Sequence, residues 1–209
     1  AFIRSECDRL RIGLLIVDSI APAVGGDVKA DNAIPFFNAL RSFGSKVTRL
    51  VVSHVTKETA QQERGSGDPY GSVFVRNFAR SAWAVQRTTE GLSGEAIEVG
   101  LFHKKVNRGP LQVPVGLRVE FEDPTGPISF KGLDVHDNAD LVSHGSIADR
   151  LYAALRAGTR TTSELVEETG SSKSSVLRTL SRRGSFTRLD GGLLGRGDEA
   201  RWGLAARQA

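Results

Sequence analysis

Ile12-Gly13-Leu14-Leu15-Ile16-Val17-Asp18-Ser19 is the stretch that decides how the rest of the chain is interpreted. It is a nearly continuous apolar run that ends in one carboxylate. Such a run is typical of a strand buried on both faces, as in a parallel sheet that helices cover. Asp18 then stands at the carboxyl end of the strand, the edge where open α/β sheets bind ligands. The stretch therefore predicts an α/β fold with a candidate site at Asp18.

Two interpretations of Asp18 agree with this stretch. In the first, the stretch is a Walker B element, whose aspartate holds Mg²⁺ on the phosphates of a nucleotide, with Ser19 beside it at the cofactor. In the second, it is a core strand that ends in a turn-forming aspartate. The stretch alone does not distinguish the two, so other parts of the chain have to decide.

The segment after Asp18 predicts a second strand parallel to the first. Residues 31–44 combine an N-cap aspartate, Asp31, with an apolar stripe and a final glycine, which together predict a helix. Residues 47–55 are rich in β-branched side chains and predict a buried strand, which ends at Ser53 and His54. A strand, a helix and a strand in this order form a βαβ unit. Asp18 and His54 are therefore expected at the same edge of a parallel sheet.

Two further groups are candidates for contact with a nucleotide. His54 would sense or orient the γ-phosphate or the attacking water; the alternative is a histidine hydrogen-bonded within the rim of the sheet. Residues 104–110, at the tip of a predicted hairpin, include Lys105 and Arg108. These cations would reach the phosphates of a neighbouring subunit, where they stabilise transition-state charge. The alternative is a solvated, charged turn.

The middle of the chain predicts a loop followed by antiparallel strands. Residues 56–70 are polar and Gly-rich and are longer than an ordinary connection, which is typical of a functional or mobile loop. A helix is predicted to begin near residues 71–72. Strands predicted at 83–88, 95–103 and 115–121 are separated by turn signals, which indicates antiparallel hairpins that extend the sheet.

Residues 146–209 predict a winged helix-turn-helix domain, joined through a linker at 134–145 to a core of residues 1–133. Helices are predicted from Ser146, from Thr162 to Gly170, and over 172–183, and a hairpin pattern follows. In a helix-turn-helix, the N-terminal residues of the third helix lie at base edges. The candidate DNA contacts are Ser172, Lys173, Ser174, Arg178, Arg182, Arg183 and, in the wing, Arg188. The alternative is a domain that contacts protein.

Composition and charge favour a cytoplasmic protein without a membrane span. The chain has 209 residues, of which 39% are hydrophobic and 25% charged, as in ordinary globular proteins. No apolar run approaches the roughly 20 residues that cross a bilayer. A single cysteine, Cys7, cannot form an internal disulfide. Residues 1–145 contain 17 Lys and Arg against 17 Asp and Glu, whereas residues 146–209 contain 11 against 7. The basic excess of the C-terminal part is compatible with nucleic acid.

Five short motifs occur in this chain in an order that is typical of a known protein family. They are Val17-Asp18-Ser19-Ile20-Ala21-Pro22-Ala23, Ser53-His54-Val55-Thr56-Lys57, Gly65-Ser66-Gly67-Asp68-Pro69-Tyr70-Gly71-Ser72, Arg80-Ser81-Ala82-Trp83 and His103-Lys104-Lys105-Val106-Asn107-Arg108-Gly109-Pro110. In this order the chain resembles the RecA-like hexameric ATPases. It looks most like the RepA-type plasmid and phage replicative helicases and the related KaiC- and DnaB-like proteins. The resemblance covers about residues 1–122.

The resemblance implies a partial RecA-like P-loop NTPase core that uses ATP and Mg²⁺ and assembles as a homo-oligomer, expected to be a hexamer. It implies Asp18 as the Walker B residue and metal ligand, His54 as the sensor, and Lys105 with Arg108 as fingers. It also implies that the 56–70 loop faces a central channel and contacts single-stranded DNA. Lys57 and Arg64 are the cations of that loop.

Part of the family pattern is missing from this sequence. No Gly-x-x-x-x-Gly-Lys-Ser/Thr occurs in it, and neither does the catalytic glutamate that the family carries before Walker B. The chain alone is therefore expected not to hydrolyse ATP. Either the natural protein has an N-terminal extension with the phosphate-binding loop, which the start at Ala1 and the absence of methionine favour, or the chain is a degenerate subunit.

The predicted function is part of an ATP-dependent motor that acts on DNA, either a replicative helicase or a helicase-like ATPase. The winged helix would bind duplex DNA and the 56–70 loop single strands. The alternative is a non-catalytic DNA-binding regulator that uses a decayed ATPase core for oligomerisation.

Overall fold

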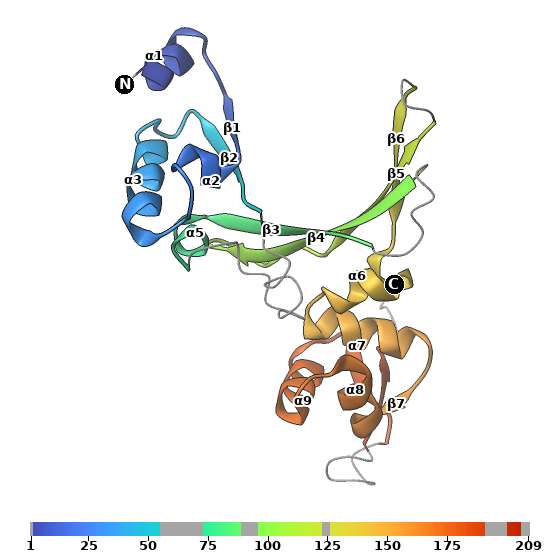
Figure 1. Ribbon diagram of the computed structural model, residues 1–209. Helices are drawn as coiled ribbons and strands as arrows, with labels where there is room; N and C mark the ends of the chain where they lie inside the picture. The colour runs from blue at the N-terminus through green and yellow to red at the C-terminus, as the bar shows by residue number, and fades with distance from the viewer. Residues whose placement is uncertain (1, 55–72, 89–95, 123–125, 191–199, 206–209) are drawn as a thin grey trace. The chain divides into compact units, whose positions relative to one another are not determined.

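The computed structural model describes residues 2–54, 73–88, 96–122, 126–190 and 200–205 (Figure 1). This part of the chain has a mixed α/β fold with parallel and antiparallel sheets. It divides into two compact units, Ala1–Ala82 with Lys104–Leu111, and Trp83–His103 with Gln112–Ala209. None of the helices in the described ranges is both long enough and apolar enough to span a membrane.

The first unit contains α1 (Phe2–Arg9), β1 (Leu14–Asp18), α2 (Ile20–Ala23), α3 (Ala30–Arg41), β2 (Thr48–Val52) and α5 (Val73–Phe78). The strands that follow are β3 (Ser81–Arg87), β4 (Ala96–Val106), β5 (Val115–Phe121) and β6 (Ile128–Leu133). Then come η1 (Val135–Asp137), α6 (Ala139–Ser143), α7 (Ile147–Arg156), β7 (Arg160–Thr161), α8 (Thr162–Thr169), α9 (Lys173–Arg182), β8 (Phe186–Arg188) and β9 (Arg201–Leu204).

Strands β1 and β2 form the predicted parallel pair. Leu14 lies opposite Thr48 and Asp18 opposite Val52, so both strands end at the same edge. The connection runs through α2 and α3, which lie on one side of the pair (Figure 1). The largest described core cluster of this unit consists of Ile20, Val28, Ala33, Phe37, Leu40 and Val75, which pack with Leu15, Val17 and Val51 of the strands. The predicted βαβ order and its parallel pairing are confirmed.

The prediction that the β1 strand is buried on both faces is wrong for the described residues. Leu15 and Val17 face the helices, whereas Leu14 and Ile16 are 50% and 56% exposed, and Leu50 on β2 is 51% exposed. Side chains alternate between the faces of a strand, so one face of the pair is buried and the other is not. Apolar composition alone did not reveal this, because both faces carry apolar residues.

Helix α3 begins earlier than predicted, with Lys29 and not Asp31 as its N-cap. The Asn32 side chain explains the earlier start. Its Oδ1 accepts a hydrogen bond from the Lys29 N–H at 2.9 Å, and its Nδ2 donates to the Asp27 carbonyl at 2.6 Å. Asn32 therefore anchors the residues that enter the helix, as a capping side chain does. Asp31 falls in the first turn, where a negative charge is favourable.

The central sheet has the strand order β3-β4-β5-β6. The β4–β5 pair is antiparallel, as predicted, and the antiparallel β5–β6 pair adds β6, a strand that was not predicted. Among the described strands, β1 and β2 form a sheet of their own. The prediction that the hairpins extend the parallel sheet is therefore wrong for the described residues. One face carries a charged row, in which Arg118 contacts Glu98 and Glu120, each at 3.0 Å, and Lys131 contacts Glu120 at 2.6 Å. Phe102 of β4 packs with Val135 and Leu141 of the helical segment that follows the sheet.

Residues 134–145, the predicted linker, contain η1 and α6. Asp134 caps η1 by accepting a hydrogen bond from the His136 N–H at 2.9 Å. The Asn138 side chain caps α6 and also donates to Glu98 Oε2 of β4 at 2.9 Å. Arg156 of α7 contacts Asp134 at 2.7 Å. These bonds tie the segment to the sheet and to α7, while the division at 134–145 into two domains stays a prediction.

Helices α7, α8 and α9 pack around one apolar core with the sheet β7-β9-β8. The core consists of Leu151, Leu155, Leu165, Val176, Leu180, Phe186, Ala200 and Trp202. The Trp202 indole donates to the buried hydroxyl of Thr162 at 3.1 Å, so these two buried polar groups pair with each other. Ser146 caps α7, Thr161 caps α8, and Gly170 ends α8 in the left-handed conformation, at φ 59°. The predicted helices and hairpin strands of this part are confirmed.

Candidate functional site

The carboxyl edge of the β1–β2 pair holds Asp18, Ser19, Ser53 and His54. Asp18 is the last residue of β1, and its partner Val52 is the last of β2, so Ser53 and His54 follow directly beyond that edge. This confirms that Asp18 and His54 lie at one edge. The Asp18–Ser19 peptide bond is cis. Both Asp18 and His54 are exposed, whereas Ser19 is buried and precedes α2.

The side chains at this edge could bind a metal ion only if a bound ligand supplied the remaining coordinating oxygens. In the described ranges there is no group of three or more His, Cys, Asp and Glu residues that could hold a metal ion. Mg²⁺ is commonly held by one or two carboxylates together with water and substrate phosphates. Asp18 alone provides one such carboxylate. The described side chains of this edge therefore do not form a metal site by themselves, and Mg²⁺ at Asp18 stays a prediction.

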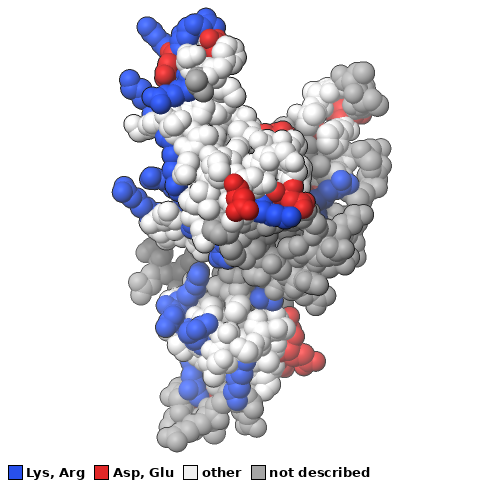
Figure 2. Space-filling model, turned by 60° about the vertical axis from the view of Figure 1, so that its left-hand side comes forward, with Lys and Arg blue, Asp and Glu red and all other residues white. Residues whose placement is uncertain are grey.

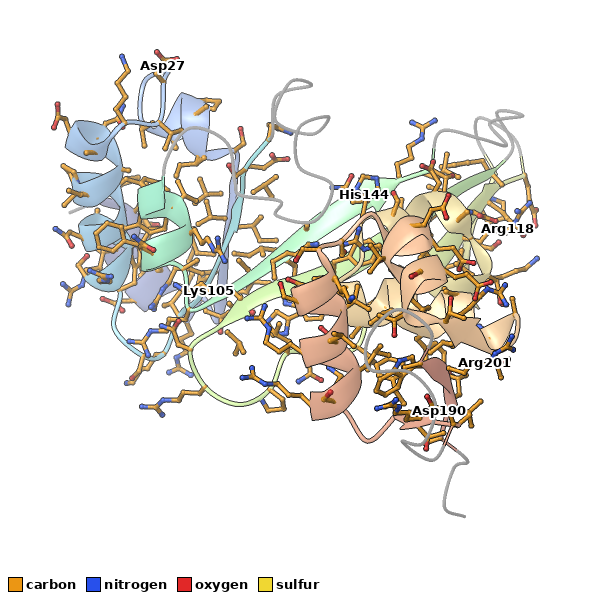
Figure 3. The ribbon with its side chains drawn as sticks, turned by 90° about the horizontal axis from the view of Figure 1, so that it is seen from below. Asp27, Lys105, Arg118, His144, Asp190 and Arg201 are labelled. Atoms are coloured by element: carbon orange, nitrogen blue, oxygen red, sulfur yellow. The ribbon has the colours of Figure 1, made fainter. Side chains whose placement is uncertain are left out.

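Lys105 binds backbone carbonyl groups at the end of α5, a contact that the sequence did not predict. Its Nζ donates to the carbonyl oxygens of Arg76, Asn77 and Ala79, at 2.6, 3.1 and 2.8 Å. An ammonium group has three protons, so these bonds use all of its donors. The carbonyls belong to the last turn of α5 and the residue after it, where the partial negative charge of a helix end favours a cation. Figure 3 shows Lys105 beside that short helix.

Arg108 lies in an exposed turn beyond Lys105. Gly109 has φ +83°, which lets the chain reverse there, and the Asn107 N–H donates to the Arg80 carbonyl at 2.9 Å. No hydrogen bond or ion pair between described residues joins Asp18 or His54 to Lys105 or Arg108. The structure therefore brings Asp18 and His54 together but does not connect them to the turn, and the finger roles stay predictions.

Helix α9 separates its side chains cleanly between core and solvent. Val176 and Leu180 are 0% and 2% exposed and face the core, while Ser174, Arg178 and Arg182 are exposed at spacings of four residues. Residues four apart lie on the same face of a helix. Lys173 and Arg183, at the two ends, are also exposed. All the predicted cations of this helix are thus on its outer surface.

Ser172 lies at the start of α9, as predicted, and its contact with DNA stays a prediction. It is the N-cap of α9, and its Oγ accepts a hydrogen bond from the Ser175 N–H at 3.4 Å. The same hydroxyl lies 3.0 Å from Ser175 Oγ and 3.2 Å from Ser174 Oγ. Its first role is to start the helix, a role that serine fills well. A contact with DNA would be additional.

Acidic side chains accompany the arginines of the C-terminal sheet but are missing from α9. The helix sequence Lys-Ser-Ser-Val-Leu-Arg-Thr-Leu-Ser-Arg contains no Asp or Glu. By contrast, Arg160 contacts Glu168 at 2.8 Å, and Arg188 contacts Asp190 at 2.6 Å. Figure 2 shows Lys and Arg gathered on the front and left of the lower part, and Asp and Glu at its right edge.

Arg188 is held by a carboxylate that the sequence analysis did not single out. Its Nε donates to Asp190 Oδ1 at 2.6 Å and its Nη2 to Oδ2 at 3.0 Å, a bidentate pair. These hydrogen bonds raise the pKa of Arg188. The spacing Arg-x-Asp at the end of a strand is the signal that could have indicated the pair, because such residues share one face. Lys57 and Arg64, the candidate single-strand contacts, lie outside the described residues.

Comparison of the chain with protein-family models, with curated proteins and with solved structures finds no match. The β1–β2 edge, with Asp18 and His54, and the outer face of α9 are the two described regions that gather the candidate functional residues.

Proposed function

We propose that this chain acts on DNA, that residues 146–209 form a winged helix-turn-helix, and that α9 binds the duplex. The observation that carries the proposal is the outer face of α9, where Ser174, Arg178 and Arg182 are exposed while Val176 and Leu180 fix the opposite face in the core. The packing of Val176 and Leu180 sets the orientation of α9, and its basic face with Arg178 and Arg182 is exposed.

The connection between α8 and α9 supports this use. Residues 170–172 join the two helices, beginning with a glycine at φ 59° and ending with the N-cap Ser172. Helix-turn-helix motifs join their helices by a turn of about three or four residues that often contains glycine. In that motif, the second of the two helices enters the major groove with its N-terminal residues at base edges. Here these are Lys173 and Ser174.

The charge of α9 supports a polyanionic partner. Binding to DNA gains much of its free energy when Lys and Arg neutralise phosphates and release counterions. Arg178, Arg182 and Arg183 supply such cations, and no acid on the same helix offsets them. Contacts to phosphates position a protein on DNA without selecting sequence. The helix therefore supports duplex binding, with any sequence preference depending on its first residues.

We extend the proposal to an ATP-dependent DNA motor with a partial RecA-like core, cytoplasmic and assembled as a homo-oligomer. Its support is the resemblance together with the shared edge of Asp18 and His54 at the end of the parallel pair. ATP and Mg²⁺ would bind at that edge, and residues 56–70 would contact single-stranded DNA. A hexamer would place Arg108 at a neighbouring subunit.

One observation favours the second candidate, a non-catalytic DNA-binding regulator. All three donors of Lys105 are occupied by carbonyls of α5 and the residue after it, so this lysine serves the fold of its own subunit. A motor that used Lys105 at phosphates would have to break these bonds. The regulator needs only the DNA-binding helix and an oligomerising core.

The test is the affinity of the whole chain for a labelled duplex, measured by fluorescence anisotropy over a range of salt concentrations. The double variant Arg178→Ala/Arg182→Ala should bind more weakly. The slope of log K against log salt should also become shallower by about 1 for each phosphate contact removed.

The control removes the same charge elsewhere, with Arg4→Ala/Lys46→Ala, two exposed positions in the first unit. Equal losses in both double variants would mean that net charge alone governs binding and would contradict the assignment to α9. No affinity for duplex DNA at low salt would reject DNA binding by this chain.

A further inference from the structure

The arginine at the end of β8 already donates hydrogen bonds from its Nε and Nη2 groups to a carboxylate. Arg188 is the last residue of β8, lies opposite Trp202, and has a side chain that is 36% exposed. Asp190, whose side chain is only 8% exposed, accepts from Nε and Nη2 with its two oxygens. Figure 3 labels Asp190 and Arg201 near the C-terminal strands, and the Leu189 N–H donates to the Arg201 carbonyl at 2.9 Å.

A phosphate group needs the same atoms of the guanidinium. Arginine binds carboxylates and phosphates by the same bidentate geometry, with two parallel N–H donors. With Nε and Nη2 directed at Asp190, a DNA phosphate has to displace the carboxylate or accept a poorer, single contact. The carboxylate also repels an approaching phosphate, since like charges at short distance disfavour each other.

We propose that Asp190 competes with DNA phosphates for Arg188 and thereby withdraws the wing from the duplex contact, which leaves α9 as the main determinant of affinity. This inference rests on the proposed duplex binding by the C-terminal part. It assigns Asp190 the role of a residue that lowers affinity without touching DNA bases.

The neighbouring charges agree with this role. Arg160 of β7 donates to Glu168 at 2.8 Å, so a second arginine at this sheet is neutralised by an acid. The charge of Arg201 acts on Glu164 and contributes to the lowered pKa of that carboxyl, whose largest cause is the hydrogen bond from the Thr161 N–H. Arg160 and Arg188, two described arginines of this sheet, thus pair with acids, in contrast to α9, whose sequence contains none.

The test compares Asp190→Asn with the wild-type chain in duplex binding across a salt series. Asn keeps the size of the side chain and one acceptor, and removes the charge that holds Arg188. The variant should bind several-fold more tightly, and its salt slope should steepen by about 0.9 because one more cation reaches a phosphate. Asp27→Asn, an exposed acid in the first unit, is the matched control for net charge and should change neither quantity.

Arg188→Ala provides a second arm, and its measurement in the wild-type background does not depend on the folding of the Asp190 variant. In the wild-type background it should leave affinity and salt slope nearly unchanged, and in the Asp190→Asn background it should remove the gain. A loss in the wild-type background as large as that of Arg178→Ala would overturn the inference.

The outcomes separate this inference from the proposed function. If the α9 double variant weakens binding but Asp190→Asn equals Asp27→Asn, duplex binding stands and the competition by Asp190 is rejected. If the wild-type chain does not bind duplex DNA, both are rejected together.

Discussion

At the scale of single residues, the ammonium group of Lys105 accounts for how α5 ends. Its Nζ donates to the carbonyls of Arg76, Asn77 and Ala79, in the last turn of α5 and just after it, where helical carbonyls depend on donors from outside the helix. Lys105→Met retains most of the apolar stem and removes the donors. We expect the free energy of unfolding, measured by denaturant unfolding, to fall by about 1–2 kcal/mol. This is at the lower end of the contribution of hydrogen bonds to a charged group, because the lysine is partly exposed.

The comparison variant is Arg108→Met, in the exposed turn three residues later, which should leave the free energy of unfolding unchanged. Equal stability of the Lys105 variant and the wild type would show that the lysine does not hold α5. Its predicted role at a neighbouring subunit's phosphates would then be the better explanation.

His136 is a second residue with a measurable electrostatic role, between η1 and α7. The carboxylate of Asp149, 3.7 Å from Nε2, and that of Asp134, 2.7 Å from Nδ1, raise the pKa of His136 above its usual 6.5. The protonated form is therefore the one that the folded state stabilises. This stabilisation is complete below the unfolded pKa and is lost as the pH rises through the higher folded pKa.

The expected result is that His136→Gln lowers the melting temperature more at pH 5.5 than at pH 8.5. At lower pH, the titration of the two carboxylates changes the stability as well. The pKa of Asp134 is lowered, and the largest cause is the hydrogen bond that it accepts from the backbone N–H of His136. The Asp149 pKa is lowered too, because bonds from His136 and Ser146 outweigh burial, which alone would raise it. Their contribution is lost as the pH falls through these lowered values. An equal decrease in melting temperature at both pH values would contradict the ion pair. His54→Gln is the control, because no ion pair of His54 is found among the described residues.

At the scale of elements, the contact between β5 and β6 depends on a glycine. A Cβ at Gly116 would lie 2.5 Å from the Leu133 carbonyl oxygen, which is backbone and cannot rotate away. Gly116→Ala should therefore destabilise the sheet by about 1–3 kcal/mol, the usual cost of overpacking, and lower the melting temperature.

The control for this prediction lies on the partner strand. Gly132 has no atom within 4 Å of the position of an added Cβ, so Gly132→Ala should have a small effect. Similar melting temperatures for both variants would mean that β6 moves to accommodate the methyl group. It would also mean that the β5–β6 register is not fixed by close approach.

Local pattern predicted most elements, because the signals for them are short-range. Ser146 and Gly170 marked helix ends through capping chemistry, and β-branched runs marked β1, β2 and β5. Strand β6 was missed because Ile-Ser-Phe-Lys-Gly-Leu is short, contains glycine and has no buried residue, so only pairing with β5 defines it. The carbonyl contacts of Lys105 join positions 26 to 29 residues apart, which no local pattern encodes.

At the scale of the whole molecule, the candidate nucleotide-binding residues and the basic helix lie in different parts of the chain. The candidate nucleotide edge, with Asp18 and His54, belongs to the first unit, and the basic helix α9 belongs to the second. Composition predicted the basic C-terminal part, because an excess of cations is visible in a count. It could not predict that Arg188 and Arg160 are neutralised by acids, because pairing depends on the packed arrangement.

This division predicts that DNA binding by the chain does not require nucleotide. The sequence contains no Gly-x-x-x-x-Gly-Lys-Ser/Thr, so Asp18 would have to hold Mg²⁺ on phosphates that no such loop in this chain grips. We expect the purified chain to hydrolyse no ATP above background and to bind duplex DNA with the same affinity whether or not Mg²⁺ and ATP are present. Phosphate release and anisotropy, measured on one preparation, check both halves, and DNA binding itself serves as the control that the protein is folded. Turnover that Asp18→Ala abolishes would reverse the conclusion, because it would show that residues of this chain outside the P-loop pattern bind and activate the nucleotide.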